Sequence, residues 1–135
     1  MKIVVAYDDS MQARKALERL SWWPAAALDV LIVTAVPGPA LNAFGDAVSR
    51  DPEKEAEAVR FQAQALASLR SRAIRAEATI CTGEPHDAVL EVAARAQADL
   101  IVTGSRGRNL ASRVLLGSVS TDILNQAPCP VLLVR

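Results

Sequence analysis

Several residue types are scarce in this chain, and each shortage excludes a class of protein. Aromatic residues make up only 4% of the 135 residues, so the core must consist of Val, Leu, Ile and Ala, as where helices pack closely on a sheet. The formal net charge is +0, with 15 basic and 15 acidic residues. Because phosphate neutralisation dominates nucleic-acid affinity, this balance disfavours a protein that binds nucleic acid or an anionic membrane surface.

Cysteine, histidine and long apolar runs are equally sparse. Cys81 and Cys129 lie far apart without CxxC spacing, which favours two reduced thiols in the cytoplasm. His86 is the single histidine, which argues against a His-based zinc site. No stretch approaches the roughly 20 apolar residues that span a bilayer, and residues 3–7 are too short a run for a signal-peptide core. We therefore expect a cytoplasmic protein with no membrane segment and no structural metal.

Short apolar runs alternate with amphipathic stretches along the whole chain. A hydrophobic fraction of 51% supports a substantial core, and the length suits one domain over residues 1–135. Strands are predicted over residues 2–7, 29–35, 74–82, 100–103 and 131–134. Helices are predicted over residues 10–20, 52–72, 85–98 and 118–126. This alternation is typical of an α/β fold with a parallel sheet covered on both faces.

The segment between the second predicted strand and the second predicted helix contains residues that favour a loop and then a helix start. Residues 36–50 contain two prolines and two glycines and are predicted as a loop. Asp51 is the expected N-cap, with Pro52 at the first helical position. We expect the inward stripe of this helix to consist of Ala56, Val59, Ala63, Leu66 and Leu69.

Ligands of open α/β sheets bind beyond the carboxyl ends of the strands, where the strand order reverses. That rule selects residues 8–10, 35–36 and 104–107. Gly104 and Gly107 follow the fourth strand, and glycine allows backbone amides to converge on one anion. The helix that opens at Gly117–Ser120 presents free N–H groups and two serine hydroxyls, which favour phosphate.

Three cations, Arg106, Arg108 and Arg113, lie in the same loop and complete the components of a polyphosphate site. Each component has a plainer interpretation. The glycines can serve only to turn the chain, the arginines can form a solvated face, and Ser118 can be an N-cap worth about 1 kcal/mol without any ligand. The loop is neither a Walker A motif nor a dinucleotide fingerprint.

Five stretches of the sequence together resemble the universal stress protein family over nearly the whole length. They are Asp8-Asp9-Ser10 after the first strand, Gly83-Glu84-Pro85, Ala98–Gly107, Pro128–Val134, and the spacing Gly104-x2-Gly107-x9-Gly117-Ser118 of the ATP-binding branch. The resemblance implies a doubly wound three-layer sandwich of about four helices on a five-stranded parallel sheet, with strand order 3-2-1-4-5. It also implies that residues 1–135 form one nucleotide-binding domain.

The resemblance further implies an ATP site, with magnesium carried on the phosphates as an option. Asp8 would accept a hydrogen bond from adenine or lie beside it, although it also suits the start of a helix. The base would lie against Ala35 and the ribose above Thr103 and Gly104. The phosphates would meet Arg106, Gly107, Gly117, Ser118, Val119 and Ser120. Asp9 stands where many relatives have glycine, and its carboxylate could either weaken phosphate binding or help to hold magnesium.

Three functions are compatible with these features. The favoured hypothesis is an ATP-binding regulatory module for stress responses, with slow hydrolysis left open. The second is an enzyme of the related adenine-nucleotide hydrolases, which usually carry a Ser-Gly-Gly-type loop after the first strand, unlike residues 8–11 here. The third is a non-catalytic interaction module with a vestigial pocket. The apolar strand Val131–Val134 is expected to form a homodimer, as the resemblance implies. The pathway, the client and the preference between ATP and ADP stay open.

Overall fold

Five parallel strands form the central sheet of the computed structural model, which describes residues 1–38, 40–41, 44, 47–48, 51–106 and 116–135. The strands are β1 (Lys2–Ala6), β2 (Asp29–Val36), β5 (Arg75–Thr82), β6 (Leu100–Gly104) and β7 (Val131–Val134). Their spatial order is β5-β2-β1-β6-β7, and every neighbouring pair is parallel. This confirms the predicted α/β class and the strand order 3-2-1-4-5.

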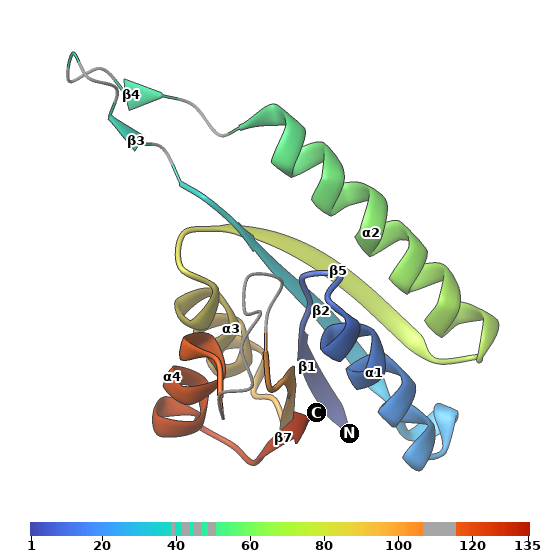
Figure 1. The fold of residues 1–135 in the computed structure, drawn as a ribbon. Helices are drawn as coiled ribbons and strands as arrows, with labels where there is room; N and C mark the ends of the chain where they lie inside the picture. The colour runs from blue at the N-terminus through green and yellow to red at the C-terminus, as the bar shows by residue number, and fades with distance from the viewer. Residues whose placement is uncertain (39, 42–43, 45–46, 49–50, 107–115) are drawn as a thin grey trace.

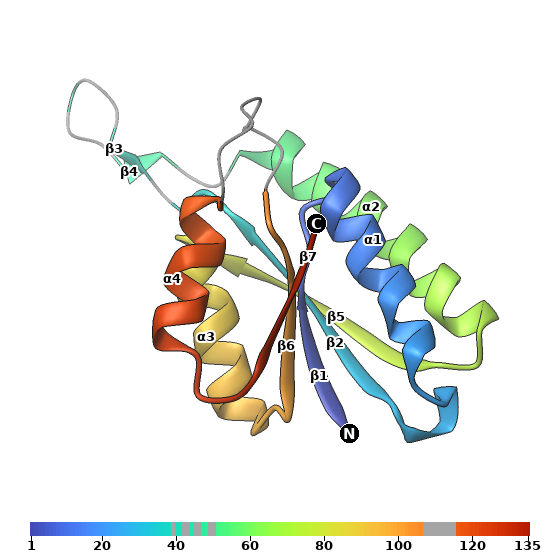
Figure 2. The same ribbon diagram turned by 60° about the horizontal axis from the view of Figure 1, so that its bottom comes forward.

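Four helices cover the two faces of the sheet (Figures 1 and 2). On one face lie α1 (Met11–Arg19) and α2 (Pro52–Ser71), and on the other lie α3 (Pro85–Ala96) and α4 (Ser118–Gln126). Two short 3-10 turns, Leu20–Trp22 and Ala25–Ala27, follow α1. Each face has its own core, because β1 alternates between Ile3 and Val5 on the α1 side and Val4 on the α3 side.

The beginnings of α1 and α2 are set by side-chain caps. Ser10 Oγ accepts a hydrogen bond from the N–H of Ala13 at 3.1 Å. Asp51 accepts one from the N–H of Glu53 at 3.0 Å, with Pro52 as the first helical residue. The N-cap predicted for α2 is therefore confirmed.

Two details differ from the sequence prediction. The buried positions of α2 are Ala58, Phe61, Gln62, Ala65 and Leu69. Of the predicted stripe, Leu69 is buried and Leu66 is half-buried against the core, whereas Ala56, Ala63 and the 54% exposed Val59 face outward. Alanines occur all round α2, so composition alone did not mark the inward face, and the contact with β2 and β5 decided it.

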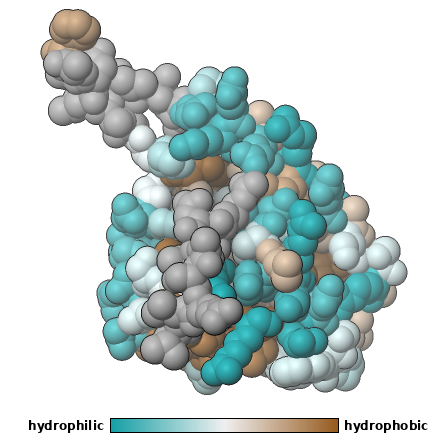
Figure 3. All heavy atoms as spheres, viewed as in Figure 1, coloured by the Kyte–Doolittle hydropathy of each residue, from teal (hydrophilic) through white to brown (hydrophobic). Residues whose placement is uncertain are grey.

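The predicted loop of residues 36–50 contains a small hairpin. Within it, β3 (Ala40–Leu41) pairs antiparallel with β4 (Ala47–Val48). Strands of two residues have no periodicity that a sequence pattern could show. The hairpin projects away from the sheet, and the described residue near its tip, Phe44, is 88% exposed. In the space-filling view hydrophobic atoms mark the end of this projection (Figure 3).

The arrangement leaves one point of the sheet open at its carboxyl edge. The chain leaves β1 toward α1 on one face and leaves β6 toward α4 on the other. The connections that follow these two neighbouring strands therefore run to opposite faces of the sheet. The turns after β1 and β6 separate as a result and leave a crevice between them. The residues chosen from the sequence surround this crevice.

Candidate functional site

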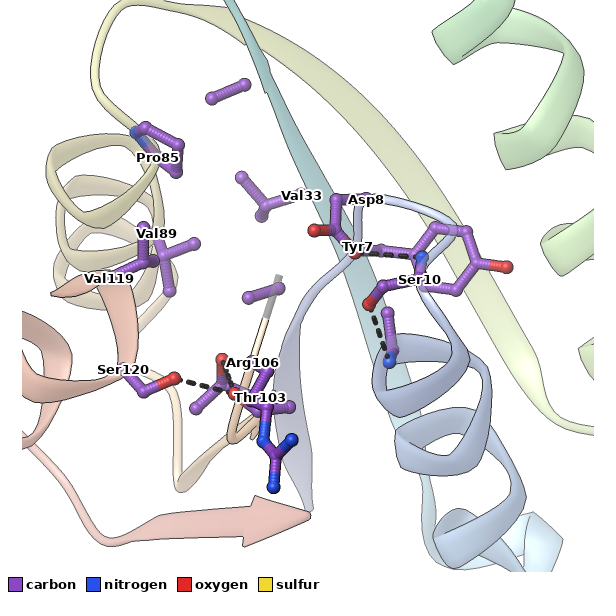
Figure 4. A pocket seen from close by; sticks show the side chains of 14 residues that line it. Tyr7, Asp8, Ser10, Val33, Pro85, Val89, Thr103, Arg106, Val119 and Ser120 are labelled. Carbon is purple, nitrogen blue, oxygen red and sulfur yellow. Dashed lines mark hydrogen bonds between the residues drawn. The ribbon is translucent and has the colours of Figure 1, made fainter. Parts of the chain in front are cut away.

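A small pocket of about 110 Å³ lies at the carboxyl ends of β1 and β6. Its walls are largely apolar, with Pro85 and Val89 from α3 and Val119 from α4 facing Asp8 and the end of β1 (Figure 4). The predicted site residues that line it are Asp8, Ala35, Thr103, Gly104, Arg106, Val119 and Ser120.

A wider cleft of about 630 Å³ adjoins this pocket. The two share Asp8, Ala35, Pro85, Val119 and Ser120. The cleft adds Gly117 and Ser118 from the beginning of α4. All nine predicted site residues within the described part of the chain therefore line the pocket, the cleft or both. The tenth, Gly107, lies outside the described residues, as do Arg108 and Arg113.

The turn between β1 and α1 directs its two acidic side chains differently. Asp8 lines both cavities, and its carboxylate also accepts a hydrogen bond from the N–H of Ser10 at 3.0 Å. Asp9 has a φ of 63°, in the left-handed region. Its carboxylate accepts two hydrogen bonds from Arg14, both at 2.9 Å, and one from the Tyr7 hydroxyl at 3.2 Å. Asp8 therefore lies in the lining of both cavities and also supports the turn before α1, whereas Asp9 faces α1.

This orientation bears on the alternatives that the sequence left for Asp9. Among the described residues that line the pocket and the cleft, Asp9 is absent. Its carboxylate is held by a guanidinium, so neither repulsion of phosphate nor magnesium binding is its evident role. Burial, followed by the charge of Asp9, raises the pKa of Tyr7 to about 12.

Gly104, at the end of β6, is a glycine for a reason that sequence reasoning missed. A Cβ at this position would lie 2.7 Å from Gln12 Cβ and 3.2 Å from the backbone carbon of Gln12. The first turn of α1 therefore packs directly on this backbone. Only a residue without a side chain allows α1 to approach the pocket so closely.

The two ends of the loop between β6 and α4 are joined by hydrogen bonds. The N–H of Gly117 donates to the carbonyl of Ser105 at 2.8 Å, and Ser120 Oγ donates to the carbonyl of Gly104 at 2.6 Å. The N–H of Ser105 in turn donates to the carbonyl of Val134 at 2.7 Å, which ties the loop to β7. The hydroxyl hydrogen of Ser120 is therefore engaged within the protein.

The N-cap of α4 is Gly117, and Ser118 is the first helical residue. The interpretation of Ser118 as an N-cap is therefore wrong. Gly117 has no side chain that could cap the helix, so the first N–H groups of α4 keep no acceptor from a cap. With the partial positive charge of the helix end and the half-buried Arg106 nearby, this wall favours an anion.

Sequence reasoning also missed the opposite wall of the cleft. It consists of four residues of α2, namely Lys54, Glu57, Ala58 and Phe61. No motif marks them, because α2 reaches the cleft only through the way it packs on β2. A signal existed in their spacing, i, i+3, i+4 and i+7, which places four residues on one helical face.

Within the described residues, no group of three or more His, Cys, Asp or Glu side chains gathers to hold a metal ion. No helix in the described part of the chain is long and apolar enough to cross a membrane. Cys81 and Cys129 are free thiols and half-buried, and burial raises the pKa of Cys129.

Comparison with known proteins agrees with this architecture. A universal stress protein of Thermus aquaticus, encoded 3' of a sulfhydrylase gene, is 36% identical over 138 residues, which cover 98% of this chain and 97% of that protein. The solved structure of UspA from Lactobacillus plantarum has a TM-score of 0.84 at 22% identity, covering 100% of this chain and 97% of that one.

Two further similar structures contain nucleotides. A universal stress protein in complex with cAMP has a TM-score of 0.72 at 25% identity, covering 100% of this chain and 96% of that one. One from Archaeoglobus fulgidus in complex with dAMP has a TM-score of 0.72 at 22% identity, covering 99% and 96%. The profile of the universal stress protein family matches residues 1–135. The chain therefore belongs to the universal stress protein family.

Proposed function

We propose that this protein is a regulatory module that binds an adenine nucleotide, with ATP as the principal ligand, and signals by its loaded state. The observation that carries the proposal is the convergence of an apolar pocket and a helix N-terminus at one crevice. Nine residues from the ends of β1, β2 and β6 and from the first turn of α4 line that crevice. An apolar base and an anionic phosphate chain need these two environments side by side.

The small pocket suits the base. Val33, Val89 and Val119 supply apolar walls around a volume of about 110 Å³. Asp8 lines the same pocket with a carboxylate, which accepts hydrogen bonds when ionised. The amino group of adenine is a donor, so this carboxylate would favour adenine over a base with a carbonyl at the same position.

The adjoining cleft suits the phosphates. Gly117 and Ser118 place the start of α4 in its wall, and Arg106 lines the adjoining small pocket. An arginine adds a fixed charge that pairs with phosphate oxygens. Magnesium would enter with the phosphates, because the described residues offer no cluster that holds a metal by itself.

The nucleotide complexes of similar proteins support the choice of ligand. The ligands of the two structures described above, cAMP and dAMP, share an adenine base and a phosphate. Binding of ATP and the involvement of magnesium are extensions that belong to this proposal. They rest on the length of the cleft beyond the small pocket.

We assign the protein a binding role, with hydrolysis at most slow. Among the described residues that line the pocket and the cleft, the side chains able to accept a proton from water are the carboxylates of Asp8 and Glu57. Asp8 already accepts a hydrogen bond from the N–H of Ser10, and among the described residues no histidine lines either cavity as an alternative base. We propose further that the protein acts in the cytoplasm as a homodimer through the exposed edge of β7.

The test begins with the freshly purified protein, which is denatured so that mass spectrometry can identify any released nucleotide. Titration calorimetry with magnesium-ATP then compares the wild type with Gly117→Val, a change that puts a branched side chain at the buried start of α4. We expect the variant to lose binding and to keep its fold. Leu124→Ala, at a 42% exposed position of the same helix, is the control and should bind as the wild type does.

Two results would contradict the proposal. One is a wild-type protein that neither releases a nucleotide nor binds magnesium-ATP. The other is unchanged affinity in Gly117→Val, which would remove α4 from the site.

A further inference from the structure

One face of α2 changes its chemical character along the helix. Ala58 and Phe61 are buried, with 1% and 7% of their surface exposed, and pack toward the sheet. One turn earlier, the same face continues with Lys54 and Glu57, which line the wide cleft. The helix therefore extends past the core, and its charged first turns form the wall opposite the start of α4.

The position of this wall is set by hydrogen bonds at the base of the cleft. Gln62 Nε2 donates to Thr34 Oγ1 at 2.8 Å and to the carbonyl of Thr79 at 2.9 Å. Thr34 Oγ1 donates to the carbonyl of Tyr7 at 2.7 Å. The ring of Tyr7 meets Phe61 edge to face, with centroids 5.7 Å apart. The middle of α2 is thus held in a defined place relative to the ends of β1 and β2, and the first turns continue from it in the same helix.

The charges on the two walls of the cleft make them suitable for a polyphosphate. The start of α4 supplies backbone donors on one side, and Lys54 supplies an ammonium group on the other. Among the described residues Lys54 forms no ion pair, whereas Arg14, Arg75 and Arg95 each pair with a carboxylate. Lysine is a flexible point charge with a long reach, which suits the mobile end of a phosphate chain.

We propose that Lys54 binds the outermost phosphate of a nucleoside triphosphate in this cleft, so that the protein distinguishes nucleotides by the length of their phosphate chain. The inference rests on the proposed nucleotide site. A monophosphate ends at the start of α4 and leaves Lys54 in solvent. A triphosphate extends into the cleft toward α2 and gains a charge-assisted hydrogen bond there.

Glu57 gives the same wall an opposing charge. It is half-buried and stands one turn after Lys54 in the lining of the cleft, which also contains the carboxylate of Asp8. Two carboxylates near a bare triphosphate oppose it, and magnesium on the phosphates offsets that repulsion. Selection by chain length should therefore be strongest when magnesium is present.

The experiment is a calorimetric titration of the full chain with AMP, ADP and ATP, each with magnesium. We expect the wild type to bind ATP at least about tenfold more tightly than AMP, the ratio for one charge-assisted contact. Lys54→Gln should weaken ATP binding about five- to tenfold and change AMP binding less than about twofold. Lys54→Arg should keep most of the preference for ATP.

Arg60→Gln is the matched control. It removes the same charge from the same helix at an exposed position outside the residues that line the pocket and the cleft. Its affinity for all three nucleotides should match that of the wild type, which separates a local contact from a change in net charge. Lys54 is exposed, so Lys54→Gln should fold normally, as circular dichroism will verify.

The outcomes distinguish this inference from the proposed function. Equal losses for AMP and ATP in Lys54→Gln, or no loss for either, would overturn the role of Lys54 while the nucleotide site stands. A wild type that binds AMP, ADP and ATP equally would do the same. A wild type that binds none of the three would overturn the nucleotide site and this inference with it.

Discussion

Gly104 and Asp9 illustrate how single residues serve this site through neighbours rather than through a ligand. The family resemblance implied a ribose contact for Gly104, which stays a prediction, and the structure adds that the first turn of α1 occupies the space of its missing side chain. Asp9 has a left-handed backbone conformation, and its carboxylate accepts hydrogen bonds from Arg14 and Tyr7. The packing on Gly104 and the contacts of Asp9 both depend on α1. Neither can be read from the glycine spacing or from the acidic turn in the sequence.

Gly104→Ala should lower the free energy of unfolding by about 1–3 kcal/mol, because the new Cβ would overlap Gln12 and displace α1. Urea denaturation measures the change. Gly38→Ala is a milder comparison, since among the described residues its Cβ would meet the methyl group of Thr82 at 3.1 Å and no backbone atom. A loss below about 0.5 kcal/mol in Gly104→Ala would show that α1 adjusts without cost.

The pKa of Tyr7 predicts a pH dependence of stability. The folded state raises this pKa from 10.0 to about 12, so it holds the phenolic proton more tightly than the unfolded chain does. The stabilisation is therefore complete below about pH 10 and is lost as the pH rises from about 10 to about 12, amounting to up to about 2 kcal/mol.

The measurement compares the unfolding free energies of the wild type and Tyr7→Phe between pH 9 and about 12. The wild type should lose its advantage over this range, because Phe has no proton to release. Parallel curves for the two proteins would mean that the folded state does not hold the Tyr7 proton.

At the scale of elements, the local sequence pattern predicted where α2 begins but did not predict which of its faces is buried. Its beginning followed from Asp51 and Pro52, whose capping chemistry is local. Its inward face did not follow, because alanine is equally acceptable in a core and on a surface. Gln62 is the clearest case, since a glutamine with 5% of its surface exposed belongs to no hydrophobic pattern and yet joins α2 to β2 and β5.

Gln62→Ala should destabilise the fold by about 2–4 kcal/mol, because it removes two hydrogen bonds and leaves a cavity beneath α2. Thermal and urea unfolding measure the loss. Gln64→Ala makes the same substitution at an exposed position of the same helix and should change stability by less than about 0.5 kcal/mol. Equal effects of the two substitutions would deny Gln62 its anchoring role.

At the scale of the whole molecule, β7 combines two features in one short strand. It is an edge strand, so one row of its backbone groups has no strand partner among the residues that the structure describes. The carbonyls of Pro130 and Val134 accept hydrogen bonds from Ile101 and Ser105 of the β6 segment. Because backbone groups alternate sides along a strand, Leu133 presents its N–H to the free edge.

Leu133→Pro tests the proposed dimer without deleting the strand. Proline removes one edge N–H and is tolerated on edge strands, so the monomer should fold with a modest loss of stability. Analytical ultracentrifugation should show a dimer for the wild type and a monomer for the variant. A dimeric variant would place the interface elsewhere, and a monomeric wild type would refute the dimer.

The sequence by itself determined the order and type of the main elements, the parallel sheet and the residues at the carboxyl ends of β1, β2 and β6. These follow from hydrophobic periodicity, glycine and proline positions and helix caps, which act over a few neighbouring residues. Tertiary structure alone decided which face of α2 turned inward, where Asp9 pointed, why residue 104 is glycine and which wall closed the cleft. Each of these depends on contacts between segments far apart in the chain, and the packing of α1 and α2 on the sheet brings them together.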